Sequence, residues 1–124
     1  MTIAYWCVLI AAFMPLLFTG IAKFSGPGFN NFKPRDFQAK LEGARLRAHW
    51  AHLNSFEAFP PFAAAVIIAH QLQFNQARLD QLAIGFILFR LVYGALYIAN
   101  RASLRSLAWA LATASWVMMF FIGQ

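Results

Sequence analysis

The run Ile3–Ala22, IAYWCVLIAAFMPLLFTGIA, decides the fold, because its 20 residues carry no charge and the run ends at Lys23. About 20 apolar residues in a helix cross the hydrocarbon core of a bilayer. A secretory signal is the competing interpretation, but nothing basic precedes the run and it is too long for the apolar part of a signal. We therefore expect a retained transmembrane helix, with Pro15 as a possible kink that membrane packing tolerates.

Three further apolar runs follow, at residues 53–72, 82–99 and 107–123. Of the 124 residues, 61% are hydrophobic and 11% are charged, whereas soluble domains have about 45–50% and about 25%. This composition excludes a soluble domain, a disordered chain and a nucleic-acid partner, despite the net charge of +6. The sequence predicts an all-α fold, a single membrane domain over residues 1–124 that forms a four-transmembrane-helix bundle.

The connection from Lys23 to about Ala48 is polar and is the only one long enough to carry a binding segment. Ser25-Gly26-Pro27-Gly28 is typical of a turn. Asp36 is expected to cap a short helix that begins near Phe37.

Basic residues are distributed very unevenly between the connections. Eight lie in the first and third connections and one, Arg78, lies in the second; the eight are Lys23, Lys33, Arg35, Lys40, Arg45, Arg47, Arg101 and Arg105. Basic loops stay in the cytoplasm. The sequence therefore predicts a multi-pass protein, expected in a bacterial inner membrane, with both termini outside.

The sequence predicts neither a disulfide bond nor a metal site. Cys7 is the only cysteine and lies inside an apolar run, so neither a disulfide nor a cysteine metal site is expected. His49 and His52 have no other histidine or cysteine near them in sequence and are interpreted as surface histidines rather than metal ligands.

Ionisable side chains inside membrane spans are costly and are candidates for function. Arg90 lies about 13 Å from the cytoplasmic end of its span at ~1.5 Å per residue, and Tyr93 and Tyr97 share its helix face. Glu57 is expected about one turn below the same surface, where Arg105 opens the fourth span. This convergence predicts a site near the cytoplasmic interface. Three alternatives stay open: an Arg90–Glu57 structural pair, the tyrosines as interface aromatics, and Arg105 as a topology determinant.

The second helix carries polar residues on both sides. On a helical wheel Arg45, His49 and His52 share one face, and Arg47, Asn54 and Glu57 occupy the opposite half. Such a helix is easier to bury at a subunit interface than in a monomer, which favours an oligomer.

The stretch His52–Phe62, HLNSFEAFPPF, resembles the second-helix motif of the MAPEG family, membrane-associated proteins in eicosanoid and glutathione metabolism. Arg90, Tyr93 and Tyr97 resemble that family's third-helix pattern, and SLRSL at residues 103–107 resembles the start of its fourth helix. The resemblance covers the whole chain. It implies a four-helix homotrimer that binds glutathione between subunits and takes a lipophilic second substrate from the membrane.

The resemblance also implies residue roles. Arg105 would be the catalytic residue that lowers the pKa of the glutathione thiol. The residues expected to contact glutathione as co-substrate are Arg47, His52, Asn54, Glu57, Arg90, Tyr93 and Tyr97. The chain departs from the family pattern at Trp50 and His49, where arginine is usual, and at Ala58, where tyrosine or asparagine is common.

The sequence leaves three functions to compare. The first is a glutathione-dependent transferase or peroxidase that acts on lipophilic substrates at the cytoplasmic side. The second is a non-catalytic protein of the same fold that binds a lipid or a partner membrane protein. The third is a small drug/proton exporter; it is disfavoured because such exporters need a glutamate in the first span, which here has no charge.

Overall fold

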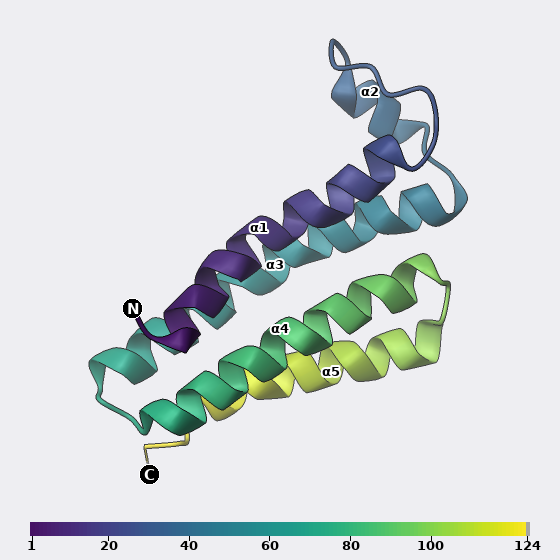
Figure 1. Cartoon of the computed structure of the whole chain (residues 1–124). Coiled ribbons are helices and arrows are strands. Elements are labelled where there is room, and N and C mark those ends of the chain that lie inside the picture. Colours follow the sequence, from purple (N-terminus) through teal and green to yellow (C-terminus); the bar gives the residue numbers. More distant parts are fainter. Residues whose placement is uncertain (124) are drawn as a thin grey trace.

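Four long helices lie side by side along the molecule, and a short helix stands at one end (Figure 1). The computed structural model describes residues 1–123, so Gln124, the last residue of the predicted domain, lies outside the described residues. The helices are α1 (Ile3–Phe24), α2 (Pro34–Ala39), α3 (Gly43–Gln71), α4 (Gln76–Ile98) and α5 (Ala102–Met118). The predicted all-α bundle is confirmed.

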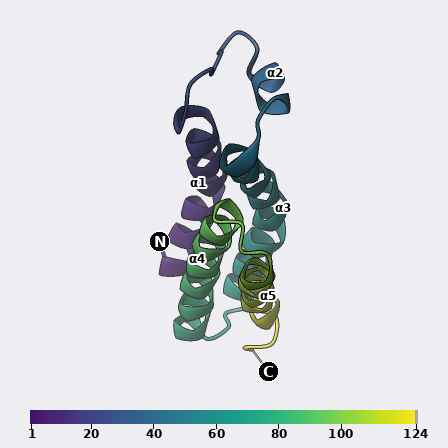
Figure 2. The same ribbon diagram turned by 90° about the vertical axis from the view of Figure 1, so that its right-hand side faces the viewer.

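The bundle consists of two antiparallel hairpins. α1 packs along α3, and α4 packs along α5. The hairpins meet mainly through α4, which touches both α1 and α3, whereas α3 and α5 make little direct contact (Figure 2). The space beside α3 and α5 is therefore where a site between the hairpins can form.

Small residues make the close helix contacts possible. Without a hydrophobic driving force between helices in lipid, small side chains let backbones approach and gain dispersion energy. At Gly94 a Cβ atom would fall 1.9 Å from the Phe18 ring, so α1 and α4 need a glycine there. The buried alanines along the helix contacts are Ala4, Ala11, Ala22, Ala48, Ala51, Ala65, Ala69, Ala83, Ala108 and Ala112.

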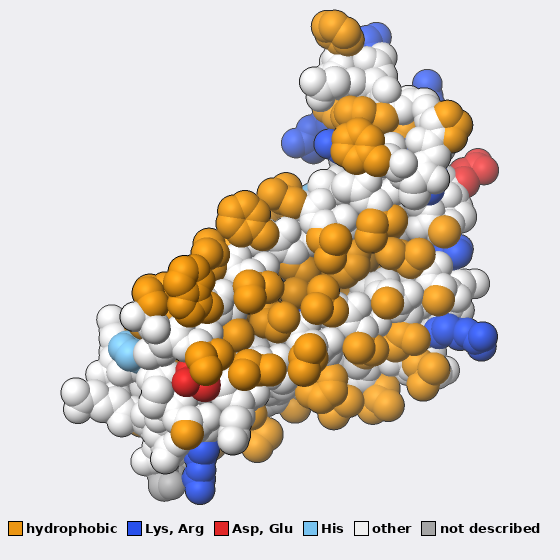
Figure 3. Space-filling view, viewed as in Figure 1, with side chains coloured by type: hydrophobic (Ala, Val, Ile, Leu, Met, Phe, Trp, Pro, Cys, Tyr) orange, Lys and Arg blue, Asp and Glu red, His pale blue; other side chains and the backbone are white. Residues whose placement is uncertain are grey.

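Large apolar side chains cover the outside of the bundle (Figure 3). On α1 they include Trp6, Phe13 and Leu17, all at least half exposed. α1 and α4 are each long and apolar enough to cross a membrane by length and composition. Polar residues interrupt α3, and α5 has only 17 residues. Within residues 1–123 these two helices therefore do not meet the length and hydropathy expected of a membrane span.

Four helix starts differ from the sequence prediction, since α4 and α5 also begin before the expected residues 82 and 107. α3 begins at Gly43, ten residues before the apolar run at Leu53. α2 begins at Pro34, and Asp36 lies in its first turn instead of capping it. Proline at the first helical position presets the helical φ and leaves no amide unsatisfied, so Pro34 starts this helix without a side-chain cap.

Polar contacts join the hairpins at the end of the bundle that holds the α3–α4 turn. Asp80 Oδ1 accepts hydrogen bonds from the Ala4 backbone amide and from Gln76 Nε2, both at 2.8 Å. Gln76 Oε1 also lies 3.1 Å from His70 Nδ1 on α3. These contacts link α1, α3 and α4 at the end opposite to α2.

Candidate functional site

Asn54 and Glu57 lie one turn apart on α3 and are joined by a hydrogen bond. Asn54 Nδ2 donates to Glu57 Oε2 at 2.9 Å. Glu57 is exposed at the side of the bundle, and Asn54 Oδ1 is buried without a hydrogen-bond donor among residues 1–123. The pair thus offers a carboxylate and a free amide oxygen, which suit a ligand ammonium or amide N–H.

Arg90 on α4 is the largest fully buried side chain of the structure, with 1% of its surface exposed. Its Cζ lies 4.2 Å from the centre of the Tyr93 ring, a cation–π contact. Its Nη2 has no hydrogen-bond acceptor in the part of the chain that the structure describes. The hydrogen bond of Glu57 goes to Asn54 rather than to Arg90. A buried guanidinium with a free N–H group is a site for an anion.

An aromatic chain connects Arg90 to Arg105. The Tyr93 and Tyr97 rings meet edge to face with centres 5.6 Å apart. Arg105 Cζ lies 4.3 Å over the Tyr97 ring, and the Trp50 ring lies 6.1 Å from the same tyrosine. Two cations from α4 and α5 are therefore held on ring faces beside the Asn54–Glu57 pair.

Three adjoining cavities follow these residues along the space beside α3, α4 and α5. The one at Arg105 has about 230 Å³ and is lined by Asn54, Tyr93, Tyr97, Arg105, Ser106 and Trp109. The next has about 330 Å³ and adds Trp50, Leu53 and Glu57. The third has about 300 Å³ and runs between Glu57 and Arg90 to Phe86, Thr113 and Trp116. The site is polar near Arg105 and mostly apolar towards Trp116.

The site lies deeper in the bundle than the sequence suggested. Arg47 Nε donates to the Ile98 carbonyl at 3.0 Å, which aligns this part of α3 with the end of α4. Glu57 is ten residues further along α3, about 15 Å at the helical rise of 1.5 Å per residue. Glu57 therefore lies further along α3 from the end of α4 than a single turn, because α3 begins well before its apolar part. Glu57 and Arg90 consequently lie at similar depths.

Two of the predicted glutathione contacts lie apart from the cluster. Arg47 Nε bonds to the end of α4, as above. His52 Nδ1 lies 2.8 Å from the Pro15 carbonyl oxygen, so its ring faces α1, where His49 stacks on it with centres 5.8 Å apart. Within residues 1–123 no group of three or more His, Cys, Asp or Glu side chains is placed to hold a metal ion.

Two tryptophans of α5, which were not predicted from the sequence, also line the site. Trp109 lines two of the cavities, and Trp116 closes the deepest one. Their spacing from Arg105, at i+4 and i+11, places all three on one helix face. That spacing was the available signal, and it was obscured because tryptophan in a membrane span is ordinarily an interface anchor.

Fold and site together define a helical membrane protein with a charged pocket between two hairpins. Comparison with known families supports the same conclusion: the model of the MAPEG family matches residues 3–123, nearly the whole chain. The chain belongs to the MAPEG family. No curated protein and no solved structure matches it.

Proposed function

We propose that this MAPEG protein is a glutathione-dependent transferase or peroxidase that acts on lipophilic substrates. The observation that carries the proposal is the buried Arg90, whose Nη2 lacks a partner among residues 1–123 and which lines the same cavity as Glu57. A buried unpaired charge strongly destabilises a protein, so an anionic ligand there is favourable. Glutathione brings two carboxylates, one ammonium and one ionisable thiol.

The charges of the site complement those of the tripeptide. Arg90 would bind a carboxylate, and Glu57 with Asn54 would bind the γ-glutamyl ammonium. Arg105 would lie near the sulfur, where a cation favours thiolate over thiol. Tyr93 and Tyr97 hold both guanidinium groups on their ring faces.

The chemistry follows from the thiolate. In a transfer reaction the sulfur attacks an electrophilic carbon, a C–S bond forms, the leaving group takes the bonding electrons, and the thiol proton goes to water. In a peroxidase reaction a lipid hydroperoxide and two glutathione molecules give the alcohol, water and glutathione disulfide. The apolar cavity end at Phe86, Trp109 and Trp116 suits the lipophilic partner.

We further propose that the protein is a homotrimer and that α3 lies at the subunit interface. An exposed stripe follows α3 at alternating spacings of three and four residues: Trp50, Leu53, Glu57, Pro60, Ala64 and Ile67. This spacing is typical of a helix that packs on other helices. A second subunit over the stripe would remove the carboxylate of Glu57 from lipid and complete the glutathione site.

We propose that this end of the bundle lies in the cytoplasm and both termini lie outside, a topology that the basic connections support. Cytoplasmic glutathione would then reach Arg105 directly. Alkaline phosphatase is active only outside the cytoplasm. A fusion of this enzyme after residue 123 should therefore be active, and an inactive fusion would contradict the proposed topology.

Calorimetry of the detergent-solubilised protein with glutathione tests the proposed ligand directly. We expect saturable binding of the tripeptide and weaker binding of S-methylglutathione, whose sulfur cannot ionise. Conjugation of chlorodinitrobenzene should follow the same saturation. Absence of glutathione binding by the wild type would falsify the proposed function.

One observation favours a second candidate, a non-catalytic protein that binds lipid or a partner membrane protein. Trp50 stands where the family usually has arginine, and Arg47, the nearest replacement, is bonded to the Ile98 carbonyl. In this case the wild type should retain lipid in the three cavities beside α3, α4 and α5 during purification and should not conjugate glutathione.

A further inference from the structure

The long connection between α1 and α3 forms an ordered lobe, defined here as residues 24–42. A single guanidinium holds its base. Arg45 on α3 donates hydrogen bonds of 2.8 to 3.2 Å to the carbonyls of Ala22, Lys23, Gly26 and Pro27. A Cβ atom at Gly26 would lie 2.9 Å from Arg45 Nη1, so a side chain there would displace the guanidinium from this position. The lobe therefore has a fixed position relative to the ends of α1 and α3.

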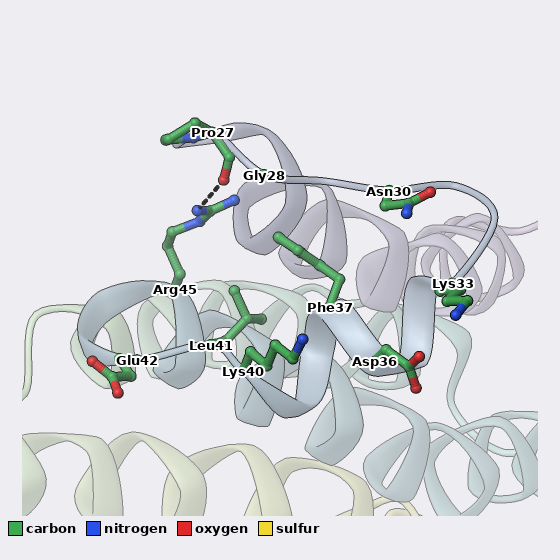
Figure 4. A pocket seen from close by; sticks show the side chains of 10 residues that line it. All are labelled: Pro27, Gly28, Asn30, Lys33, Asp36, Phe37, Lys40, Leu41, Glu42 and Arg45. Carbon is green, nitrogen blue, oxygen red and sulfur yellow. Dashed lines mark hydrogen bonds between the residues drawn. The ribbon is translucent and has the colours of Figure 1, made fainter.

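Aromatic rings and cations build the interior of the lobe. Phe29 meets Phe24 and Phe37 edge to face, with ring centres 5.4 and 5.5 Å apart. Lys23 Nζ lies 4.9 Å from the Phe29 ring centre, and Arg45 Cζ lies 5.1 Å from that of Phe37. A hollow of about 610 Å³ lies between the lobe and α3, with Phe37 and Leu41 towards its interior and Lys33, Asp36, Lys40 and Glu42 around it (Figure 4).

The outside of the lobe combines bare aromatic rings with positive charge. Phe32 is 96% exposed and Phe24 is 73% exposed. The exposed basic residues are Lys33, Arg35 and Lys40, against the exposed acidic residues Asp36 and Glu42. Nearly complete exposure of a phenylalanine beside lysine and arginine is typical of segments that lie in the headgroup region of a membrane.

The position of the lobe brings it to that region. α1 loses its apolar character at Lys23, which marks the bilayer surface at this end. The lobe stands off the side of α1 away from α4 and α5, above the flank where large hydrophobic side chains are exposed (Figures 1 and 3). A phospholipid whose chains lie along α1 would have its headgroup at the lobe.

We propose that the lobe is a binding site for anionic phospholipid of the adjoining leaflet. Phe24 and Phe32 enter the headgroup region, and Lys33, Arg35 and Lys40 bind the phosphate and any further acidic group of the lipid. Attraction of an anionic surface strengthens binding about fivefold for each basic residue near it. This assignment does not depend on glutathione or on the reaction, because it uses none of the residues of that site.

Native mass spectrometry of the intact protein measures the lipid preference. In mild detergent with phosphatidylglycerol or phosphatidylcholine of the same acyl chains, the wild type should retain phosphatidylglycerol at several-fold lower lipid concentration. A combined Lys33→Ala, Arg35→Ala and Lys40→Ala variant should lose that preference. Arg78→Ala, an exposed charge at the other end of the bundle, should keep it. Equal retention of the two lipids by the wild type overturns the proposal.

A nitroxide at position 32 measures the depth of the lobe. Cys7 is the only cysteine, so Phe32→Cys in a Cys7→Ala background carries one label. In phosphatidylglycerol bilayers the label should be more accessible to oxygen than to a water-soluble nickel chelate. Adding the triple alanine change, which removes the three positive charges, should reverse this order. A label that stays in bulk water in phosphatidylglycerol and in phosphatidylcholine bilayers overturns the proposal and favours a soluble partner protein. The mass-spectrometric comparison remains decisive if the Cys7→Ala background folds poorly.

Discussion

At the scale of single residues, Arg105 and Glu57 are assigned to different parts of the same ligand, and variants should separate their effects. Arg105→Ala should abolish the ultraviolet absorbance of bound thiolate at neutral pH, since the free thiol has a pKa of about 8.5 or higher, while glutathione still binds. Glu57→Gln should weaken binding by about 1–3 kcal/mol, the scale of a lost charge-assisted hydrogen bond. The thiolate in the remaining complex should persist.

The control for this pair is assembly. If Arg105 serves topology alone and Glu57 serves packing alone, both variants should lose expression and oligomer together, with no separate effect on binding or ionisation. Size-exclusion chromatography of each variant beside the absorbance measurement distinguishes the two outcomes.

Arg90 should behave as a residue kept for ligand binding at the expense of stability. Its guanidinium is buried with a free Nη2 in the described structure, and apolar replacement of buried charge is often stabilising by about 1–4 kcal/mol. Arg90→Met should therefore raise the unfolding midpoint of the ligand-free protein and abolish glutathione binding. A variant that unfolds more easily without ligand and still binds glutathione would contradict this role.

Sequence reasoning found the charged part of the site because ionisable groups in apolar runs are conspicuous. Each of these predicted residues lines at least one of the three cavities: Asn54, Glu57, Arg90, Tyr93, Tyr97 and Arg105. It could not establish that Arg47 and His52 turn to backbone carbonyls, because a helical wheel gives a side chain's direction but not its partner. The burial of Arg90 could not be predicted either, because it depends on how the α1–α3 hairpin packs on the α4–α5 hairpin.

At the scale of elements, the end of α1 depends on one side chain of another helix. The last carbonyls of a helix have no partner within it, and Arg45 binds those of Ala22 and Lys23 and two in the following turn. Arg45→Ala should destabilise the protein by about 1.5–3 kcal/mol, the value for hydrogen bonds to a charged group. Limited proteolysis within residues 24–42 should become faster, and thermal unfolding should begin earlier.

Arg101→Ala is the matched control for that change, because Arg101 is an exposed arginine at the same end of the bundle. It should leave both proteolysis and unfolding unchanged. Equal protection of the lobe in the Arg45 and Arg101 variants would show that Arg45 does not hold it.

The number and order of the long helices followed from the apolar runs alone. Their ends did not, since α3 extends ten residues before Leu53 and α4 begins at Gln76, before the expected span at Leu82. Hydropathy detects the part of a helix that lies in hydrocarbon, whereas backbone hydrogen bonding continues into polar sequence. Asn75 shows this at α4, where its side chain accepts a hydrogen bond from the Arg78 amide at 3.0 Å and caps the helix.

At the scale of the whole molecule, the exposed stripe of α3 should be covered by other copies of the chain. Native mass spectrometry in mild detergent should show three chains. Leu53→Lys on the stripe should dissociate the assembly because it places a charge in an apolar contact, and glutathione binding should be lost with it. Leu88→Lys on the exposed face of α4 is the comparison, and it should leave the oligomer intact. A wild type that is stable as a monomer and binds glutathione would contradict an inter-subunit site.

Family and bundle architecture were accessible from composition and motif because both are encoded locally. Subunit number is different, since it depends on how an exposed helix face matches another copy, and one chain shows only half of that contact. The wheel of α3 predicts an oligomer, and Trp50, Leu53 and Glu57 are exposed in the single chain, so the subunit number stays a prediction.

The division into two hairpins has a consequence for how the protein is made. A ribosome that has synthesised α1 to α3 has released helices able to pair with each other in the bilayer, but Arg90 and Arg105 have not yet emerged. Asn54 is then without the cover of α4 and α5, whereas Glu57 stays exposed even in the complete monomer. The pocket is thus the last part of the monomer to be completed during synthesis, because α4 and α5 carry Arg90, Tyr93, Tyr97 and Arg105 and are made last.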